Sequence, residues 1–199
     1  MLKLYNIDNN YLNYLRTYDN RVIKNHGIDR PYVGIILKVT IRGKTIKYFA
    51  PLSSPKPKHL TMKNTIDFIK IGNGKYGAIN LNNMIPLASH HATLIDINKV
   101  NPPSYKNLLT NQITWIRSNQ NTIITKAKYL YSKMIQEDSK LSNFEINVKS
   151  RCCDFLLLEW ICDKYNNQTQ NTQIKWFVCF FISQYSFNPK TRKPKIKNI

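Results

Sequence analysis

A short proline-rich segment, residues 50–59, gathers hydroxyl, ammonium and imidazole groups that could act on a phosphate. It reads APLSSPKPKH, with serines at positions 53 and 54, lysines at 56 and 58 and a histidine at 59. Serine hydroxyls donate hydrogen bonds, and lysine supplies positive charge where negative charge develops during phosphate chemistry. Taken alone, such a run is more often an exposed basic loop than a catalytic site, so both interpretations stay open at this point.

Signatures of other catalytic classes do not occur in the sequence. The chain has four histidines and no H-E-x-x-H pattern, and its 11 acidic residues are scattered. These features speak against a zinc site and against a two-metal nuclease site. A phosphate-binding G-x-x-x-x-G-K-[ST] loop and a G-x-S-x-G elbow are also missing. We therefore expect neither a metal nor a cofactor.

The charge balance indicates an anionic partner. The 199 residues include 30 Lys+Arg against 11 Asp+Glu, a formal charge of +19, and 42% are hydrophobic, which is too many for a disordered chain. Residues 166–199 hold six of the basic residues and no acidic one, so residues 1–165 carry the remaining +13. Nucleic acid is the default partner for such a surface.

The sequence favours a cytoplasmic protein that does not enter a membrane. The start lacks the apolar run of a secretory signal. The longest apolar stretch, Trp176–Ile182, has seven residues, whereas a spanning helix needs roughly 20. The four cysteines, Cys152, Cys153, Cys162 and Cys179, are expected to be reduced and buried.

The elements that must position segment 50–59 follow from hydrophobic periodicity. Asp8 can cap a helix that carries Tyr11 and Leu15. A period of two over Val33–Ile41 and Thr45–Ala50 predicts a β-hairpin, with Pro51 and Pro55 ending its second strand. Shorter β segments are expected at Thr65–Ile71, Tyr76–Leu81, Met84–Leu87 and Thr93–Ile97.

Three helices are expected in the second half of the chain. The first begins after Pro103 with Ser104 as its cap, and the second buries a stripe from Ile123 to Met134. The third runs from about Asp154 to Tyr165. The order of helix, strands and helices predicts an α+β fold. We expect residues 1–165 to form one domain and residues 166–199 a polar, basic and partly disordered extension, dispensable for folding from about Pro189.

Several short motifs occur in order along residues 1–165: Leu4-Tyr5 with the following Tyr11–Leu15 and Asp19, then Tyr32–Ile35, Tyr48–Lys56, Ala78–Pro86, and Cys153–Phe155 with Leu158-Glu159. Together they resemble the ToxN/AbiQ/CptN family, the endoribonuclease toxins of type III toxin–antitoxin systems.

The resemblance implies a twisted antiparallel β-sheet core partly wrapped by helices, similar to the Kid/MazF toxins. It implies metal-independent cleavage of A-rich RNA and inhibition by a repeat-derived antitoxin RNA that assembles with the toxin, in phage abortive infection. Because segment 50–59 concentrates hydroxyl and ammonium groups, we expect attack by the RNA's own 2′-hydroxyl, leaving a 2′,3′-cyclic phosphate and a 5′-hydroxyl.

Carried over by motif, Ser54 and Lys56 are the central catalytic residues, with Ser53 beside them. Tyr11 matches a helix-borne tyrosine that approaches the site, although a core aromatic is the alternative. Arg30 falls where a member of the family has lysine.

The residues expected to contact RNA are Arg30, Tyr32, Lys58, His59, Lys38, Lys106 and Arg117. For Lys38, Lys106 and Arg117 a solvated basic face is the competing explanation. The competing function for the whole chain is a non-catalytic basic RNA-binding protein, which would have no need of the Ser53–Lys56 cluster.

Overall fold

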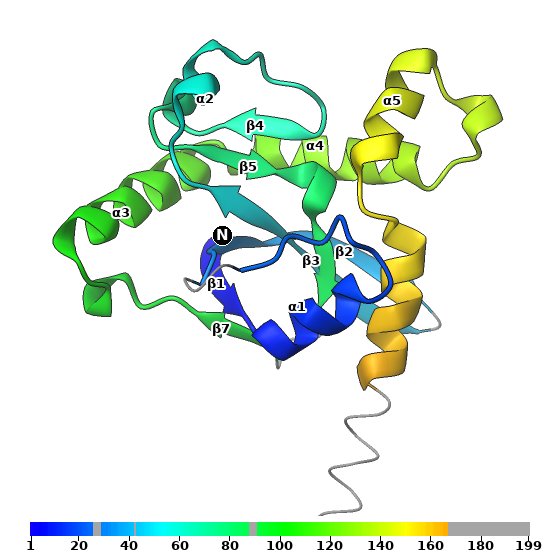
Figure 1. Ribbon diagram of the computed structural model, residues 1–199, viewed down its shortest axis with the longest axis horizontal. Coiled ribbons are helices and arrows are strands. Elements are labelled where there is room, and N and C mark those ends of the chain that lie inside the picture. The colour runs from blue at the N-terminus through cyan, green and yellow to red at the C-terminus, as the bar shows by residue number, and fades with distance from the viewer. Residues whose placement is uncertain (26–28, 42, 88–90, 167–199) are drawn as a thin grey trace, which may run out of the picture. The chain divides into compact units, whose positions relative to one another are not determined.

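An antiparallel sheet organises the protein (Figure 1). The structure is a computed structural model, and it describes residues 1–25, 29–41, 43–87 and 91–166. Within these residues the sheet has seven strands in the order β4-β5-β3-β2-β1-β7, and β6 also pairs with β3. The strands are β1 (Lys3–Ile7), β2 (Tyr32–Ile41), β3 (Lys44–Ser53), β4 (Phe68–Lys70), β5 (Ala78–Asn80), β6 (Ile85–Leu87) and β7 (Ala92–Leu94).

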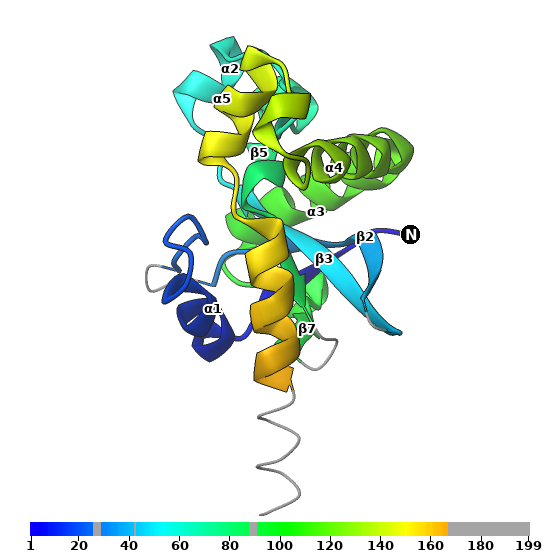
Figure 2. The ribbon, with the colours of Figure 1, turned by 90° about the vertical axis from the view of Figure 1, so that its right-hand side faces the viewer.

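Helices lie on both sides of this sheet. They are α1 (Asn9–Arg16), α2 (Pro57–Thr61), α3 (Pro103–Ser118), α4 (Gln120–Met134) and α5 (Asn143–Arg151), and a further helical segment begins at residue 155. In Figure 1, α1 lies in front of the strands while α3 and α4 lie behind them, and Figure 2 shows the same two sides edge on. The predicted α+β fold with an antiparallel sheet is confirmed, whereas the similarity to Kid/MazF toxins stays a prediction.

Two compact units divide the chain, Met1–Cys162 and Asp163–Ile199. The sheet and helices α1 to α5 belong to the first unit. The predicted extension 166–199 lies outside the described residues apart from Asn166, and so do Arg42 of the hairpin turn and Cys179. Cys152, Cys153 and Cys162 are buried, as expected, and Cys152 and Cys153 form no disulfide. Among the described residues, no helix has the length and apolar character required to cross a membrane.

The predicted hairpin is present as β2 and β3, but its alternation is interrupted. The register shifts between Gly34 and Leu37, where β2 bulges against β3. Ile36 is therefore buried and Ile35 only half-buried, the reverse of the predicted pattern. Ile35 and Ile36 both lie between the residues that pair with Phe49 and Tyr48, so the alternation is interrupted at these two positions and resumes at Leu37, which is buried.

The prediction that Pro51 ends the second strand is wrong, because β3 continues to Ser53. Leu52 donates its backbone N–H to the carbonyl of Pro31 at 2.9 Å, so the nitrogen of Pro51 faces the opposite edge of β3. On that edge β3 pairs with β6 up to Phe49 and with β5 from Leu52 onward, so Pro51 lies between the two pairings. Proline is accommodated because no ladder hydrogen bond is required of it there.

The stripes predicted for the long helices are confirmed. Leu109, Ile113 and Ile116 of α3 are buried, and so are the residues of α4 from Ile123 to Met134 at spacings of three and four. Pro102, not Ser104, stands at the cap of α3, and Pro103 occupies the first turn, where a missing N–H costs nothing.

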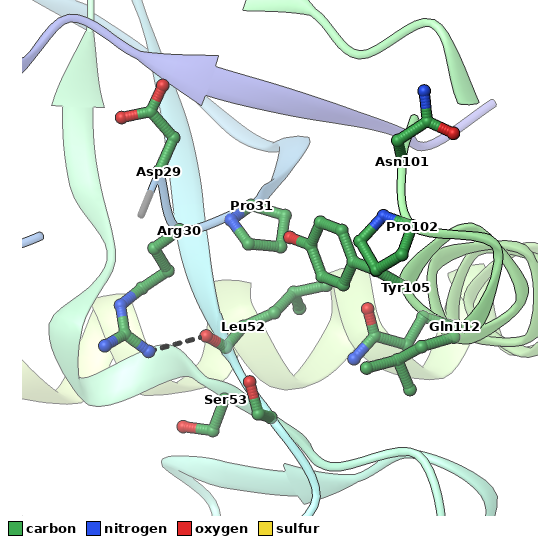
Figure 3. A pocket seen from close by; sticks show the side chains of 11 residues that line it. Asp29, Arg30, Pro31, Leu52, Ser53, Asn101, Pro102, Tyr105 and Gln112 are labelled. Carbon is green, nitrogen blue, oxygen red and sulfur yellow. Dashed lines mark hydrogen bonds between the residues drawn. The ribbon is translucent and has the colours of Figure 1, made fainter. Parts of the chain in front are cut away.

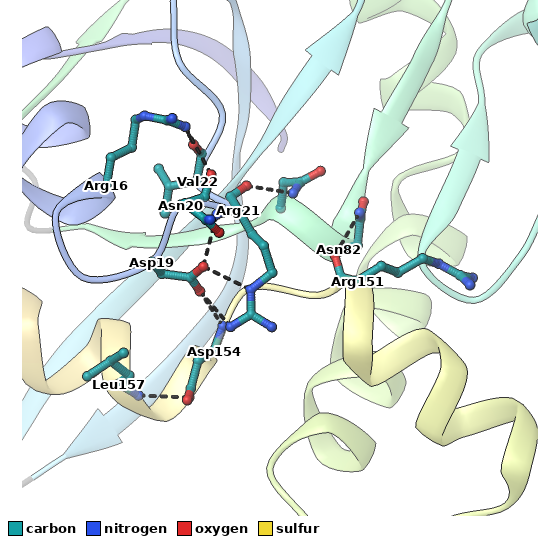
Figure 4. Close-up of polar contacts among 10 residues, drawn as sticks. Arg16, Asp19, Asn20, Arg21, Val22, Asn82, Arg151, Asp154 and Leu157 are labelled. Atoms are coloured by element: carbon teal, nitrogen blue, oxygen red, sulfur yellow. Dashed lines mark hydrogen bonds and ion pairs between the residues drawn. The ribbon is translucent and has the colours of Figure 1, made fainter.

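A buried carboxylate ties the segment after α1 to the start of the last helical segment (Figure 4). Asp19 accepts hydrogen bonds from the Arg21 guanidinium at 2.8 Å and from the backbone N–H of Asp154 at 2.7 Å. Burial alone would raise the pKa of Asp19, but these hydrogen bonds outweigh it and the pKa is lowered. A second pair, Arg151 with Asp67 at 2.8 Å, joins α5 to the segment before β4.

Candidate active site

The Ser–Lys cluster lies where β3 leaves the sheet. Ser53 is the last residue of β3 and is half-buried, whereas Ser54 and Lys56 are exposed. The chain then enters α2 at Pro57, so the expected loop through His59 is instead a short helix with proline in its first turn. The three groups are thus presented at the surface by a strand end on one side and a helix on the other.

Asn80 of β5 holds the Ser53 side chain. Its amide nitrogen donates to Ser53 Oγ at 2.7 Å and lies 3.3 Å from the carbonyl oxygen of Pro51. The Pro51 carbonyl oxygen can only accept a hydrogen bond, so the amide nitrogen of Asn80, and not its oxygen, must face it. With Oγ accepting from Asn80, the Ser53 hydroxyl can itself donate to a phosphate oxygen.

The turn before β5 packs directly under the two serines. Gly77 has a φ of +92°, and a Cβ built on it would lie 1.9 Å from the carbonyl oxygen of Ser53 and 3.1 Å from the carbonyl carbon of Ser54. Only glycine fits this position without displacing the backbone of the cluster. The position of Ser53 and Ser54 is therefore set by β5 and its preceding turn as well as by β3.

A cavity of about 610 Å³ opens beside Ser53 and Ser54 (Figure 3). Arg30 lies on its strand side, where its Nη1 donates to the carbonyl of Leu52 at 2.9 Å and its Nε is buried without a partner. Tyr105 and Gln112 of α3 line the opposite side. The structure thus brings Arg30 next to the serines, which gives the site a cation in addition to Lys56.

Tyr11 lies in the core in this structure. Its hydroxyl donates to the carbonyl of Pro86 at 2.7 Å and its ring stacks on His91 with centroids 5.0 Å apart. The side chain is 0% exposed. From this position the phenol supports α1 against β6, which agrees with the core-aromatic alternative; a catalytic role for Tyr11 stays a prediction.

Two of the residues expected to contact RNA are buried. Tyr32 is 0% and His59 2% exposed, and burial raises the pKa of Tyr32. Burial, with the nearby charges of Lys58 and Lys56, lowers the pKa of His59. Neither side chain can contact RNA from where it lies, because strand β2 and helix α2 pack them inward; here both act as packing residues.

The remaining basic residues that were expected to contact RNA lie on three different elements, α2, α3 and β2. Lys58 is exposed on α2, two positions after Lys56. On α3, Lys106 donates to the carbonyl of Asn98 at 3.3 Å and Arg117 to that of Leu2 at 3.5 Å. Lys38 is exposed on β2, opposite Lys47.

Lys38 does not belong to the neighbourhood of the cluster. Its partner Lys47 stands six residues before Ser53 on β3. At 3.3 Å per residue this separation along the strand is about 20 Å. A solvated strand face therefore explains Lys38 in this structure.

The site also contains residues that the sequence did not single out. Asn80 lies inside one of the motifs quoted above, but nothing in its type predicts a contact with Ser53. Tyr105 and Gln112 come from α3, more than 50 positions after the serines, and only the packing of α3 brings them there. Among the residues that the structure describes, no group of three His, Cys, Asp or Glu could hold a metal ion.

The fold and this site define the class of protein. A toxin structure solved in work on type III toxin–antitoxin systems and selective toxin inhibition by a non-coding RNA pseudoknot superposes with a TM-score of 0.71. It shares 30% identity, over 83% of this chain and 98% of that one. The architecture is therefore that of a type III toxin.

The sequence comparisons identify the family. Residues 3–163 match the family described as "Toxin ToxN, type III toxin-antitoxin system". Endoribonuclease ToxN of Bacillus thuringiensis subsp. kurstaki is 30% identical over 172 residues, covering 84% of this chain and 86% of that protein. Endoribonuclease ToxN of Pectobacterium atrosepticum is 29% identical, covering 86% and 98%. The chain belongs to the ToxN family.

Proposed function

We propose that this protein is an endoribonuclease toxin whose active site is the cluster Ser53, Ser54 and Lys56. The observation that carries the proposal is the anchoring of Ser53 by Asn80 at a strand end, which presents Ser54 and Lys56 to solvent beside a cavity. Its relatives from Bacillus thuringiensis and Pectobacterium atrosepticum are named endoribonucleases. A merely basic binding surface would not require this arrangement.

The side chains of this cluster are suited to a reaction in which the RNA's own 2′-hydroxyl attacks the phosphorus atom. In that step the 2′-oxygen forms a bond to phosphorus and the bond from phosphorus to the 5′-oxygen breaks. The 2′-hydroxyl proton is lost and the departing 5′-oxygen gains one, leaving a 2′,3′-cyclic phosphate and a 5′-hydroxyl.

Each group of the cluster has a place in that reaction. Lys56 stabilises the negative charge that grows on the phosphorane oxygens. Ser53 donates a hydrogen bond to a phosphate oxygen, and Ser54 holds or relays a proton at the reacting centre. No step assigned to these residues requires a divalent metal. Tyr11 contributes by holding α1 against β6.

We further propose that the substrate is A-rich RNA and that a repeat-derived antitoxin RNA binds over the same face as the substrate. The net charge of +13 over residues 1–165 supports an RNA partner. A related toxin was solved in work on inhibition by an RNA pseudoknot. Assembly into a toxin–RNA hetero-oligomer, action in the cytoplasm where transcripts are made, and a role in abortive infection belong to the same proposal.

Single-turnover cleavage in excess EDTA tests the proposal. Ser54→Ala and Lys56→Ala should each lower the rate constant about 10²- to 10³-fold, as loss of one preorganised donor typically does. Lys128→Ala, an exposed lysine of α4, serves as the matched control and should leave the rate unchanged. Full cleavage by the Ser54→Ala/Lys56→Ala double variant would place the active site elsewhere and favour a binding role for this surface.

A further inference from the structure

The cavity beside Ser53 and Ser54 contains a buried side chain with an unused acceptor. Gln112 is 1% exposed, its Nε2 donates to the carbonyl of Tyr76 at 2.8 Å, and its Oε1 has no partner. Because the Tyr76 carbonyl can only accept, the nitrogen of the amide must face it. The amide orientation is therefore fixed, Oε1 is a buried acceptor without a partner, and Gln112 is one of the residues that line the cavity.

The neighbours of Gln112 on α3 complete one wall of this cavity. Tyr105, Leu108 and Gln112 stand at spacings of three and four, so they share one face of the helix, and all three line the cavity. In Figure 3, Tyr105 and Gln112 lie opposite Arg30 and Ser53. An aromatic ring, an aliphatic side chain and an oriented acceptor thus face the same space.

This combination suits a flat, mostly apolar ligand that brings an N–H group. A volume of about 610 Å³ is in the usual range of small-molecule sites. A buried acceptor without a partner costs free energy, which a donor from a ligand would recover. Single-stranded RNA is read by stacking unpaired bases on aromatic rings and by hydrogen bonds to their edges.

We propose that this cavity is the subsite for a nucleobase next to the scissile phosphate, and that Gln112 Oε1 selects bases with an exocyclic amino group. The inference rests on the proposed function only in taking Ser53 and Ser54 as the place where the phosphate binds. Tyr105 supplies the face on which the base stacks.

An oriented acceptor discriminates among bases by the atoms at their edges. Adenine and cytosine present an amino group as a donor at the rim of the base. Uracil offers its ring N–H only between two carbonyl oxygens, and these would be brought against Gln112 Oε1. Uracil should therefore be rejected, whereas amino-bearing bases are accepted.

Binding of short RNAs to the full chain carrying Lys56→Ala tests this inference. The probes are fluorescein-labelled 5′-UUXUU-3′ oligonucleotides, with X as adenosine, purine riboside, cytidine or uridine. Purine riboside is adenosine without the amino group. We expect adenosine to bind about ten- to a hundredfold more tightly than purine riboside, and cytidine more tightly than uridine.

Variants of the cavity wall separate recognition from folding. Gln112→Met in the same background should abolish both differences, and Tyr105→Ala should weaken all four probes about tenfold. Tyr129→Ala, an exposed tyrosine of α4, is the matched control and should change nothing. The adenosine and purine riboside comparison needs no cavity variant, so it holds even where Gln112→Met lowers stability.

Two results would overturn the inference. Equal affinity for all four probes in the chain that retains Gln112 would mean that the cavity holds only solvent. An amino preference that survives Gln112→Met would assign recognition to another residue. Failure of the chain with an intact Lys56 to cleave RNA would instead count against the proposed function, because the binding preference is measured without cleavage.

Discussion

At the scale of single residues, the site depends on how one serine is held. Asn80 Nδ2 donates to Ser53 Oγ at 2.7 Å and so holds the serine side chain in one orientation. Asn80→Ala should lower kcat about tenfold with little change in KM, because the serine loses its orientation while the RNA-binding surface remains. Steady-state cleavage kinetics measure this. An unchanged kcat would show that Ser53 needs no positioning.

Gly77 is the second residue on which the cluster depends. A Cβ there would lie 1.9 Å from the Ser53 carbonyl oxygen, so Gly77→Ala should destabilise the protein by about 3 kcal/mol and lower cleavage activity. Gly43→Ala is the matched control, because Gly43 also has a positive φ, of +76°, but nothing lies within 4 Å of its Cβ position. It should cost about 1 kcal/mol and keep full activity. Urea unfolding and cleavage assays distinguish the two, and equal losses would contradict the argument.

At the scale of elements, the sequence predicted the helices and strands whose apolar residues recur at a regular spacing. The hairpin and the stripes of α3 and α4 follow directly from the spacing of apolar residues. Helix α5 was missed because it buries few apolar side chains, although Ser142 and Glu145 form a capping box that was readable in the sequence. Strand β1 was missed because its five residues alternate poorly, and it is specified by its pairing with β2 and β7.

The candidate site likewise has a part that the sequence predicts and a part that it does not. The Ser53–Lys56 cluster could be predicted because its groups are consecutive in the chain. Tyr32 and His59 were expected at the surface, but their burial depends on how β2 and α2 pack. The cavity wall on α3 could not be predicted, because no local pattern encodes the approach of Gln112 to a strand end far away in the sequence.

The connection between elements at Asp19 makes stability depend on pH. The pKa of Asp19 is lowered from its ordinary value of 3.8, so its contribution is present above about pH 4 and is lost as the pH falls through the folded pKa. Asp19→Asn should cost about 2 kcal/mol at neutral pH, and this cost should shrink as the pH falls below about 4. Thermal melts across this range measure the difference, with the exposed Asp96→Asn as control. A cost that does not change with pH would assign the effect to packing.

At the scale of the whole molecule, charge should control the affinity for RNA. Residues 1–165 carry a net +13, and each phosphate that they neutralise releases counterions. With about four phosphate contacts, the affinity for a single-stranded RNA should fall about 10- to 100-fold between roughly 50 and 200 mM salt. Fluorescence anisotropy over a salt series measures the slope, and an affinity that hardly changed would exclude a basic RNA-binding face.

The ends left on cleaved RNA test the central claim most directly. Wild-type protein is incubated with RNA in excess EDTA, and the product termini are identified by mass spectrometry. Attack by the 2′-hydroxyl at a site built from Ser53, Ser54 and Lys56 predicts 2′,3′-cyclic phosphate and 5′-hydroxyl ends, formed without divalent metal. Products with 3′-hydroxyl and 5′-phosphate ends, or cleavage that occurs only when Mg²⁺ is added, would contradict this account.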